Sequence, residues 1–408
     1  MKIILYHPTG NSNVRALAEA LAKAGLLQRF YTCIALFQNS VFYKLSKFGP
    51  LKVFHRRLFA QRLKEYTYIR PYRELGRIAS QKLGWKNALV HENGIFCVDK
   101  VYSDLDVHVS KKLGGVNSVY AYEDGALQTF KMAKSKGINC FYDLPIGYWR
   151  AHRKYLEYER LSRPDWATTL TGFKDSKKKL AYKDQELALA DIIFVASNFT
   201  KKTLELYPGT LAPIHVIPYG FPEVYQKRTY EKFINRKLRL LYVGGLSQRK
   251  GIANILEATE RLSEQVELTI VGRKVVERCD VLNKGLAKHT WIASMSNSEI
   301  LILMRTHDVF VFPSLFEGYG LVISEAMSQG TPVITTDRTC GADFIRDGEN
   351  GWLVNAGDSM SLVEKLKTIL EQPTCLEKVG QEAMKTAEAM PLSLYGDRMA
   401  KVIKLYIE

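Results

Sequence analysis

The sequence predicts an α/β protein made of two doubly wound halves that face each other across a cleft. Strand-like and helix-like segments alternate along the chain in two successive series. The strand-like segments are continuous apolar runs, which is typical of parallel strands covered on both faces. The 408 residues are enough for two domains of ordinary size, each with its own core.

The first series begins with a strand at 3–7, a turn at 8–11 and a helix at 14–25 that Gly25 closes. Further strands are expected at 118–122, 138–142 and 191–197. We therefore assign residues 1–215 to an N-terminal domain.

A second series follows the segment 214–221, where two prolines and a glycine indicate a linker. Its expected strands alternate with helices such as 251–265, and we assign residues 216–385 to a second domain. The last segment, 386–408, has a helical pattern. The strands of this series are expected at 238–245, 266–272, 308–314 and 332–336.

The positive charge is confined to the first half. Residues 1–215 hold 34 Lys and Arg against 18 Asp and Glu, whereas residues 216–408 hold 24 of each. Residues 40–90 alone contain 12 basic and two acidic side chains. Such a segment suits an anionic membrane surface, nucleic acid or an acidic substrate, and it is also compatible with a solvated helix face. The apolar and aromatic residues interleaved with these charges are Val41, Phe42, Phe48, Phe54, Leu58, Phe59 and Tyr66.

No apolar run approaches the roughly 20 residues that span a bilayer, and the N-terminus passes directly from a short strand into a polar turn. These features predict a cytoplasmic protein, which the basic segment would place peripherally at the inner face of the membrane. The six cysteines are scattered, without the short paired spacing of a zinc, redox or disulfide framework. No metal or cofactor is therefore expected.

The most informative motif is FEGYGLVISEAM at 316–327, which carries two carboxylates, Glu317 and Glu325. Gly318 and Gly320 permit close approach of a ligand to the backbone, and the following helix start offers free N–H groups to a phosphate or sugar oxygen. Both carboxylates are expected to face one ligand. Glutamates near helix starts also occur simply because they complement the helix dipole.

A second motif, YVGGLSQRKGI at 242–252, joins a strand, a Gly-Gly turn, two adjacent cations and a helix start. Arg249 and Lys250 supply the positive charge that phosphate recognition needs, and the small residues allow close approach.

In this order and spacing, residues 308–354 resemble the signature of the retaining nucleotide-sugar glycosyltransferases of family 4, which have the GT-B fold. The resemblance implies that Glu317 contacts hydroxyls of the transferred sugar and Glu325 the ribose. It also implies that Arg249 and Lys250 stabilise the departing diphosphate without a metal, and that 386–408 crosses back onto the N-terminal domain. The remaining donor-binding residues implied are Gly10, Gly245, Gly318, Tyr319, Gly320 and Leu321.

Several positions depart from the family pattern. Gly245 stands where an arginine is usual, and Gly10 is the single glycine of a turn that often has two. Asp343 replaces a usual glutamate and is interpreted as structural. Ser197 is expected to cap the helix that follows it.

The departure with most bearing on chemistry is at the strand 138–142. Many relatives have a histidine after this strand, whereas this chain has Tyr142 and Asp143. We expect Asp143 to line the acceptor side, with a turn or capping role as the alternative. Glu123 and Asp124 are weaker candidates. The triplet at 104–106, which resembles the metal-binding DXD pair of another glycosyltransferase fold, is interpreted as a chance match.

The resemblance thus implies a retaining, metal-independent hexosyltransferase. It would move a sugar from a nucleotide-diphosphate sugar to a hydroxyl of a lipid-linked or anionic glycan acceptor, in polysaccharide or glycolipid biosynthesis. One alternative is a sugar-nucleotide epimerase of the same fold, for which the basic surface has no purpose. The other is a basic nucleic-acid-binding protein, which would explain the charge but not the glutamate pair.

Overall fold

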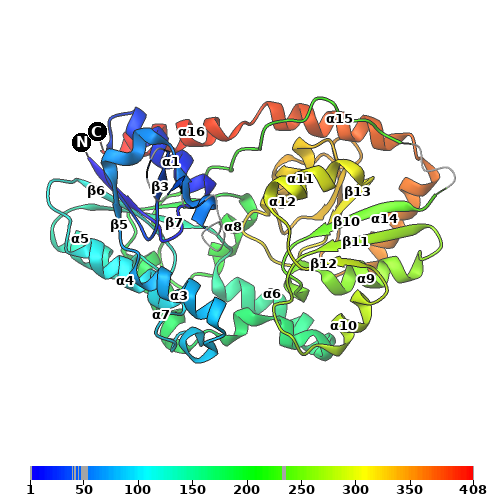
Figure 1. Cartoon of the computed structure of the whole chain (residues 1–408), viewed down its shortest axis with the longest axis horizontal. Helices are drawn as coiled ribbons and strands as arrows, with labels where there is room; N and C mark the ends of the chain where they lie inside the picture. The colour runs from blue at the N-terminus through cyan, green and yellow to red at the C-terminus, as the bar shows by residue number, and fades with distance from the viewer. Residues whose placement is uncertain are drawn as a thin grey trace.

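The computed structural model describes residues 2–38, 40, 43–44, 46, 54–231 and 236–407. Of the apolar residues in the basic segment, Val41, Phe42 and Phe48 lie outside the described residues. The described chain forms two α/β domains that lie side by side and are joined at one end by the C-terminal helices (Figure 1).

The first domain has a sheet of seven parallel strands within the described residues. Their order places the first strand in the interior of the sheet, third of the seven, with the chain winding outward in both directions, as in a doubly wound fold. In spatial order the strands are β5 (Thr67–Ile69), β2 (Leu27–Thr32), β1 (Ile3–Tyr6), β6 (Ser118–Tyr122), β7 (Asn139–Leu144), β8 (Ile192–Val195) and β9 (Ile214–Val216).

Helices cover both faces of this sheet, and a short ribbon of β3 (Leu36–Phe37) and β4 (Leu58–Phe59) lies beside it. The predicted first helix is present, but it begins at Ser12, two residues before the predicted start, because Asn11 caps it by accepting a hydrogen bond from the Val14 N–H. The helices are α1 (Ser12–Lys23), α3 (Tyr72–Leu83), α4 (Val98–Ser110), α5 (Leu127–Ser135), α6 (Trp149–Ser162), α7 (Lys177–Leu189) and α8 (Asn198–Thr203).

The second domain repeats the plan with six parallel strands in its described part. In spatial order they are β12 (Thr290–Ile292), β11 (Val266–Val271), β10 (Leu238–Val243), β13 (Val309–Phe312), β14 (Val333–Thr336) and β15 (Trp352–Val354). Its helices are α9 (Ile252–Arg261), α10 (Asp280–Leu286), α11 (Asn297–Thr306), α12 (Leu321–Ser328), α13 (Gly341–Phe344), α14 (Ser359–Glu371) and α15 (Cys375–Glu388).

The last helix, α16 (Leu392–Ile407), leaves the second domain and packs against α1 of the first (Figure 1). The backbones approach closely here, since a Cβ added to Gly396 would lie 2.8 Å from the Ala16 carbonyl oxygen. The linker after β9 runs beside this crossing, where the Phe221 N–H donates to the Met390 carbonyl at 2.8 Å. The two chain crossings thus lie together at one side of the interdomain boundary.

A small apolar cluster joins the domains near the segment that precedes Glu317. Phe316 and Leu315 of the second domain pack among Ala151, Leu156 and Phe199 of the first. Burial of these side chains favours a fixed position for the loop that carries Glu317.

Polar contacts reinforce this junction. The Gly318 carbonyl accepts hydrogen bonds from the Ser197 hydroxyl at 2.6 Å and the Thr200 hydroxyl at 2.8 Å. Ser197 also caps α8, as predicted, by accepting from the Thr200 N–H. A Cβ on Gly318 would lie only 1.9 Å from the Pro145 carbonyl oxygen, so this contact between the domains requires glycine.

Candidate functional site

Glu317 lies in the loop between β13 and α12, directly beside the cations that follow β10. Its Oε2 atom is 2.6 Å from Lys250 Nζ and 3.5 Å from Arg249 Nη1. Arg249 also donates to the Phe316 carbonyl at 2.7 Å. Because β10 and β13 are neighbours in a parallel sheet, both loops leave the same carboxyl edge, where doubly wound folds bind ligands.

These contacts set the charge state of Glu317. Burial alone would raise the pKa of its carboxyl, but Lys250 and Arg249 together hold that pKa down at about 2. Glu317 is therefore ionised at neutral pH, and its carboxylate is a pure hydrogen-bond acceptor. Two motifs that are 67 residues apart in sequence thus form one charged cluster.

Glu325, in contrast, faces the space between the domains. It is carried by α12, and its Oε1 atom accepts a hydrogen bond from Asn297 Nδ2 at 2.8 Å. Burial raises the pKa of this carboxyl, and the Asn297 bond partly offsets that effect. Glu325 lines a cavity of about 640 Å³, which we call the interdomain cavity.

The interdomain cavity has one wall from each domain. The second domain contributes Leu321, Ser324 and Glu325 from α12, together with Asn297. The first domain contributes the turn 9–11 and the start of α1. It also contributes four arginines, which are Arg15, Arg56, Arg57 and Arg77.

The Gly10 turn is held in place from inside the first domain. Gly10 has a φ of +51°, a conformation that favours glycine. Burial, with a smaller contribution from Arg57, lowers the pKa of His7 to about 3. The neutral His7 ring then accepts at Nδ1 from the N–H groups of Thr9 and Gly10, both at 3.1 Å.

The remaining donor residues expected from the resemblance do not all face a cavity. Leu321 lines the interdomain cavity, and Gly320, with a φ of +92°, forms the turn into α12. Tyr319 is only 3% exposed and donates its hydroxyl hydrogen to the Tyr219 carbonyl at 2.7 Å. Gly318 lies against the first domain, and the Gly245 carbonyl accepts from the Tyr242 hydroxyl at 3.1 Å.

The two glutamates also differ from expectation in one respect. We expected both to face one ligand, yet only Glu325 is part of the wall of the interdomain cavity. Glu317 is engaged with Lys250 instead, so a ligand that reaches both carboxylates must compete for or share that ion pair.

Asp143 lies inside the first domain. Strand β7 continues to Leu144, two residues beyond the predicted strand, so Asp143 is a strand residue rather than the start of a turn. It is 4% exposed and accepts a hydrogen bond from the Tyr120 hydroxyl at 2.7 Å. Burial raises its pKa to about 7. Asp143 is thus buried against Tyr120 in this structure, and its assignment to the acceptor side stays a prediction.

Glu123 and Asp124 directly follow β6 and contact a lysine of α7. Glu123 is buried and lies 3.2 Å from Lys183 Nζ, while Asp124 Oδ1 lies 3.6 Å from the same nitrogen. Burial raises the pKa of Glu123 to about 7 although Lys183 lowers it. Both acids are held by cations of their own domain.

Sequence reasoning missed His152, which lies on α6 nine positions beyond Asp143. Its ring packs edge-on against Phe316, with 5.1 Å between ring centroids, and it lines a second cavity of about 220 Å³ together with Arg249. Burial, aided by Arg249, lowers the pKa of His152 to about 4, so the ring is neutral. No spacing rule could find this contact, because it joins a helix of one domain to a loop of the other.

The acidic triplet at 104–106 has structural roles. Asp104 forms an ion pair with Arg70 at 2.8 Å, and Asp106 accepts from the N–H groups of Gln128 and Thr129 at the start of α5. Neither carboxylate faces the interdomain cavity.

One cluster of metal-ligand types was not anticipated from the sequence. His91, Glu92 and Asp175 have ligand atoms within 4.8 Å of one another. The protein already supplies donors to them: Glu92 accepts from the Ser176 N–H at 2.7 Å, and Asp175 lies 3.3 Å from Lys179 Nζ. His91 and Glu92 are adjacent, but Asp175 comes from a distant part of the chain, so no ligand spacing was visible.

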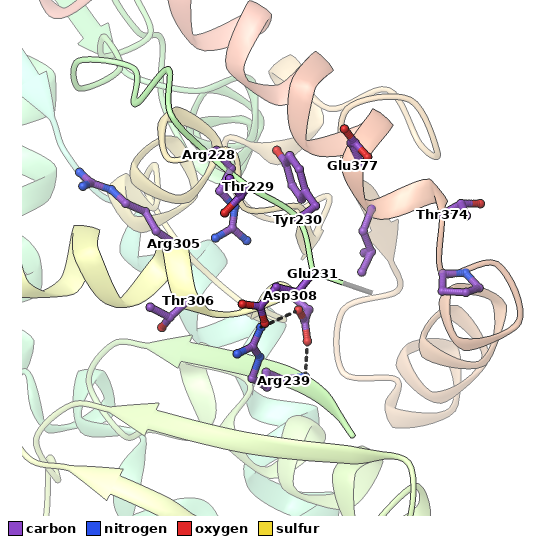
Figure 2. A pocket seen from close by; sticks show the side chains of 12 residues that line it. Arg228, Thr229, Tyr230, Glu231, Arg239, Arg305, Thr306, Asp308, Thr374 and Glu377 are labelled. Carbon is purple, nitrogen blue, oxygen red and sulfur yellow. Dashed lines mark hydrogen bonds and ion pairs between the residues drawn. The ribbon is translucent and has the colours of Figure 1, made fainter. Parts of the chain in front are cut away.

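A further cavity, of about 340 Å³, lies at the opposite edge of the second sheet (Figure 2). Its Arg239 is at the beginning of β10, and its Asp308 directly precedes β13. Arg239 Nη2 lies 3.0 Å from Glu231 Oε2 and 3.4 Å from Asp308 Oδ1. Glu231 and Asp308 thus balance the charge of Arg239. This cavity lies at the amino ends of β10 and β13, whereas Lys250 and Glu317 follow their carboxyl ends.

None of the helices in the described parts of the chain combines the length and the apolar character that crossing a bilayer requires.

Comparison with known proteins adds the following. Residues 226–386 match the family model described as glycosyl transferases group 1. The putative glycosyltransferase EpsD of Bacillus subtilis (strain 168) is 30% identical over 191 residues, which is 45% of this chain and 50% of that protein. The capsular polysaccharide biosynthesis glycosyltransferase CapM of Staphylococcus aureus is 26% identical over 244 residues, 54% of this chain and 62% of that protein. The matches thus span about half to three fifths of these relatives.

Among solved structures, that of Anabaena Alr3699/HepE in complex with UDP-glucose aligns with 99% of this chain and 100% of its own, at a TM-score of 0.63 and 15% identity. The likeness therefore extends over both domains and the α16 crossing, beyond the segment that the family model matches.

Proposed function

We propose, from the premise that residues 226–386 are a glycosyl transferases group 1 domain in a chain with the GT-B fold, that this protein transfers a sugar from a nucleotide-diphosphate sugar to an acceptor hydroxyl. HepE is a protein of this fold that binds UDP-glucose, which supports a nucleotide-sugar donor. The sugar transferred is a hexose in this proposal.

The observation that carries the proposal is the cluster of Glu317, Lys250 and Arg249 at the carboxyl edge of the second sheet. The cluster pairs a carboxylate that can accept sugar hydroxyls with two cations suited to a diphosphate. Glu325, one helix turn into α12, faces the adjoining interdomain cavity and in this proposal accepts hydrogen bonds from the ribose.

The donor would replace part of the contact between Lys250 and Glu317. The diphosphate attracts Lys250 and Arg249, while the sugar hydroxyls donate to the carboxylate that Lys250 releases. Once the donor is bound, Lys250 and Arg249 already face the diphosphate, so they stabilise the charge that develops on it with little further reorganisation.

We extend the proposal to transfer with retention of configuration, on the resemblance of residues 308–354 to family 4. The bond between the anomeric carbon and the diphosphate oxygen breaks, and the acceptor oxygen bonds to the same face. The departing diphosphate oxygen takes the proton of the acceptor hydroxyl. The protein acts through positioning and electrostatics in this scheme, with Arg249 and Lys250 in place of a metal.

The donor proposal is tested by a thermal-unfolding screen against nucleoside diphosphates and nucleotide sugars, beginning with UDP and UDP-glucose. A ligand present at 100 times its dissociation constant should stabilise the folded protein by about 2.7 kcal/mol. A parallel assay for release of nucleoside diphosphate should reveal slow hydrolysis of the matching nucleotide sugar. If no nucleoside diphosphate raises the melting temperature, the donor site proposed here does not exist.

For the acceptor, we propose a glycan or a lipid-linked glycan met at an anionic membrane surface. CapM, which acts in capsular polysaccharide biosynthesis, supports the first part. The second part rests on a surface around α3 in which exposed aromatic side chains alternate with basic ones. Tyr72 and Trp85 are 62% and 57% exposed, and Lys86 beside Trp85 is also exposed. Aromatic and basic side chains together suit the interface of an anionic bilayer.

The membrane proposal predicts that the protein sediments with anionic vesicles at low salt and is released at high salt. Each basic side chain near the surface contributes about 1 kcal/mol before screening. Trp85→Ser combined with Lys86→Glu should lower the bound fraction. Met132→Ser combined with Lys131→Glu, the same change on exposed residues of α5, should not. Wild-type protein that stays in the supernatant with anionic vesicles at low salt rules out the membrane surface.

A further inference from the structure

The first-domain wall of the interdomain cavity carries more positive charge than the protein neutralises. It holds the four arginines Arg15, Arg56, Arg57 and Arg77. Across the described part of the chain, Glu74 is the one carboxylate that forms an ion pair with any of them. It lies 2.8 Å from Arg57 and 2.7 Å from Arg77. One negative charge therefore serves two arginines, and the other two have none.

Arg15 and Arg56 are the arginines left for a ligand. The Arg15 guanidinium donates to the carbonyls of Gly10, at 3.0 Å, and of Arg56, at 3.3 Å, and it forms no ion pair within the described residues. The Arg56 side chain is exposed on the cavity wall and makes no ion pair within the described residues. Burial lowers the pKa of Arg15, and the negative charge of Glu19, which forms an ion pair with Arg62, offsets this effect only in part.

The surroundings of these two arginines are fixed. Arg57 donates to the Thr9 carbonyl, so the ion pair with Glu74 braces the Gly10 turn from behind. The α1 helix starts at this turn, and its first residues, Ser12 and Asn13, also line the cavity. The N–H groups of a first helical turn lack acceptors within the helix and add donors for an anion.

Phosphate matches this wall better than a neutral sugar does. A guanidinium binds phosphate oxygens through parallel hydrogen bonds, and the helix start favours negative charge. The opposite wall carries Glu325, which we have assigned to the donor ribose. The arginines therefore face the donor from the domain that is left for the acceptor.

We propose that Arg15 and Arg56 bind a phosphoryl group of the acceptor, so that the acceptor is a phosphorylated sugar or a lipid-linked phosphate. This inference rests on the proposed function, since it takes the second domain as the donor side. It differs from the membrane contact, because the arginines line a cavity whereas Tyr72 and Trp85 lie on the exposed surface.

The test measures two affinities by calorimetry, one for UDP and one for a phosphate probe. The probes are glucose 1-phosphate, as a soluble phosphomonoester, and citronellyl phosphate, as a short lipid phosphate. Arg56→Gln and Arg15→Gln should each weaken binding of the phosphate probe about ten-fold, as expected for the loss of one charge-assisted contact. Both variants should leave the UDP affinity within about two-fold of wild type. Lys131→Gln, an equal loss of charge on exposed α5, should change neither.

Arg56→Gln is the decisive variant, because its side chain makes no ion pair that folding would miss. Phosphate affinity that is unchanged in this variant overturns the proposal, and so does wild-type protein that fails to bind either phosphate probe. Loss of UDP affinity equal to the loss of phosphate affinity would assign the arginines to the donor and also overturn it. Failure of UDP and all other nucleotides to bind, with phosphate binding intact, would instead contradict the proposed function alone. Tighter binding of one probe identifies the soluble or the lipid-linked source.

Discussion

Replacing both Arg249 and Lys250 with alanine should lower kcat/KM by about 10²–10⁴-fold, since fixed charges aimed at a developing anion contribute several kcal/mol in a site shielded from water. Lys250 should account for most of the loss. Its Nζ is 2.6 Å from Glu317, while Arg249 lies farther away and also holds the Phe316 carbonyl. Steady-state rates with the nucleotide sugar identified by the screen provide the measurement.

A structural effect must be separated from this chemical one. Lys250→Ala leaves the largely buried Glu317 without its closest cation, and removal of one partner of a buried pair destabilises by roughly 3–5 kcal/mol. The double variant Lys250→Ala with Glu317→Gln removes both charges and should recover most of the melting temperature without recovering activity. Lys288→Ala, an exposed lysine paired with Glu260, should match wild type in both measurements. Recovered activity in the double variant would contradict the clamp.

The acid dependence of stability provides an independent check on the same pair. The pKa of Glu317 is held at about 2, below its ordinary value of 4.5, so the folded state binds this proton less tightly than the unfolded state. The stability that the pair contributes is therefore present above pH 4.5 and is lost as the pH falls toward 2. Glu317→Gln should lack this acid-sensitive increment.

Activity should also persist in a chelator, and a loss that magnesium restores would contradict the metal-independent proposal.

The fold was accessible from the sequence because most of its longer strands are largely buried and apolar. The GT-B fold expected from the resemblance is confirmed, and the strand predicted at 118–122 coincides with β6. The strands that were missed have a different character. β2 carries Gln28 and Arg29 among its apolar residues, and β5, β9 and β12 have only three residues each, too few for a periodic signal.

The site was only partly accessible, because several of its contacts join the two domains. Glu317 and Lys250 were identified from separate motifs, but their ion pair depends on β10 and β13 being neighbours. Gly318 and Tyr319 lie in the motif expected to bind the donor, yet both contact other protein groups. The Gly318 carbonyl accepts hydrogen bonds from the Ser197 and Thr200 hydroxyls, and the Tyr319 hydroxyl donates to the Tyr219 carbonyl.

The basic first half illustrates the same limit. Its charge was interpreted from composition as one surface, whereas the structure divides it between two. Arg56 lines the interdomain cavity, and Lys86 lies on the exposed surface near α3. Composition cannot distinguish a cavity wall from a solvated face, because that distinction depends on which residues the fold brings opposite them.

Replacement of Glu317 and replacement of Glu325 should impair different properties, turnover in the first case and nucleotide affinity in the second. Glu325→Ala should weaken binding of the free nucleoside diphosphate about 10–100-fold, because a charged acceptor that holds ribose hydroxyls contributes roughly 1.5–3 kcal/mol. The loss should appear in calorimetry with the nucleotide alone. The Asn297 side chain donates to Glu325 at 2.8 Å and lies in the same cavity wall. In the variant, water in the cavity can replace this lost acceptor.

Glu317→Gln should have the opposite signature, with turnover reduced at least ten-fold and nucleotide affinity within about three-fold of wild type. Glutamine keeps the shape of the side chain but accepts hydroxyl hydrogens less strongly, and it no longer balances Lys250 while the diphosphate departs. The free nucleoside diphosphate lacks the sugar that Glu317 is proposed to hold, so its binding should hardly change. Glu364→Gln, on the exposed side of α14, serves as the matched loss of one carboxylate. If both site variants retain wild-type turnover and affinity, neither glutamate holds the donor. If instead the two signatures are exchanged, Glu317 holds the ribose and Glu325 the sugar.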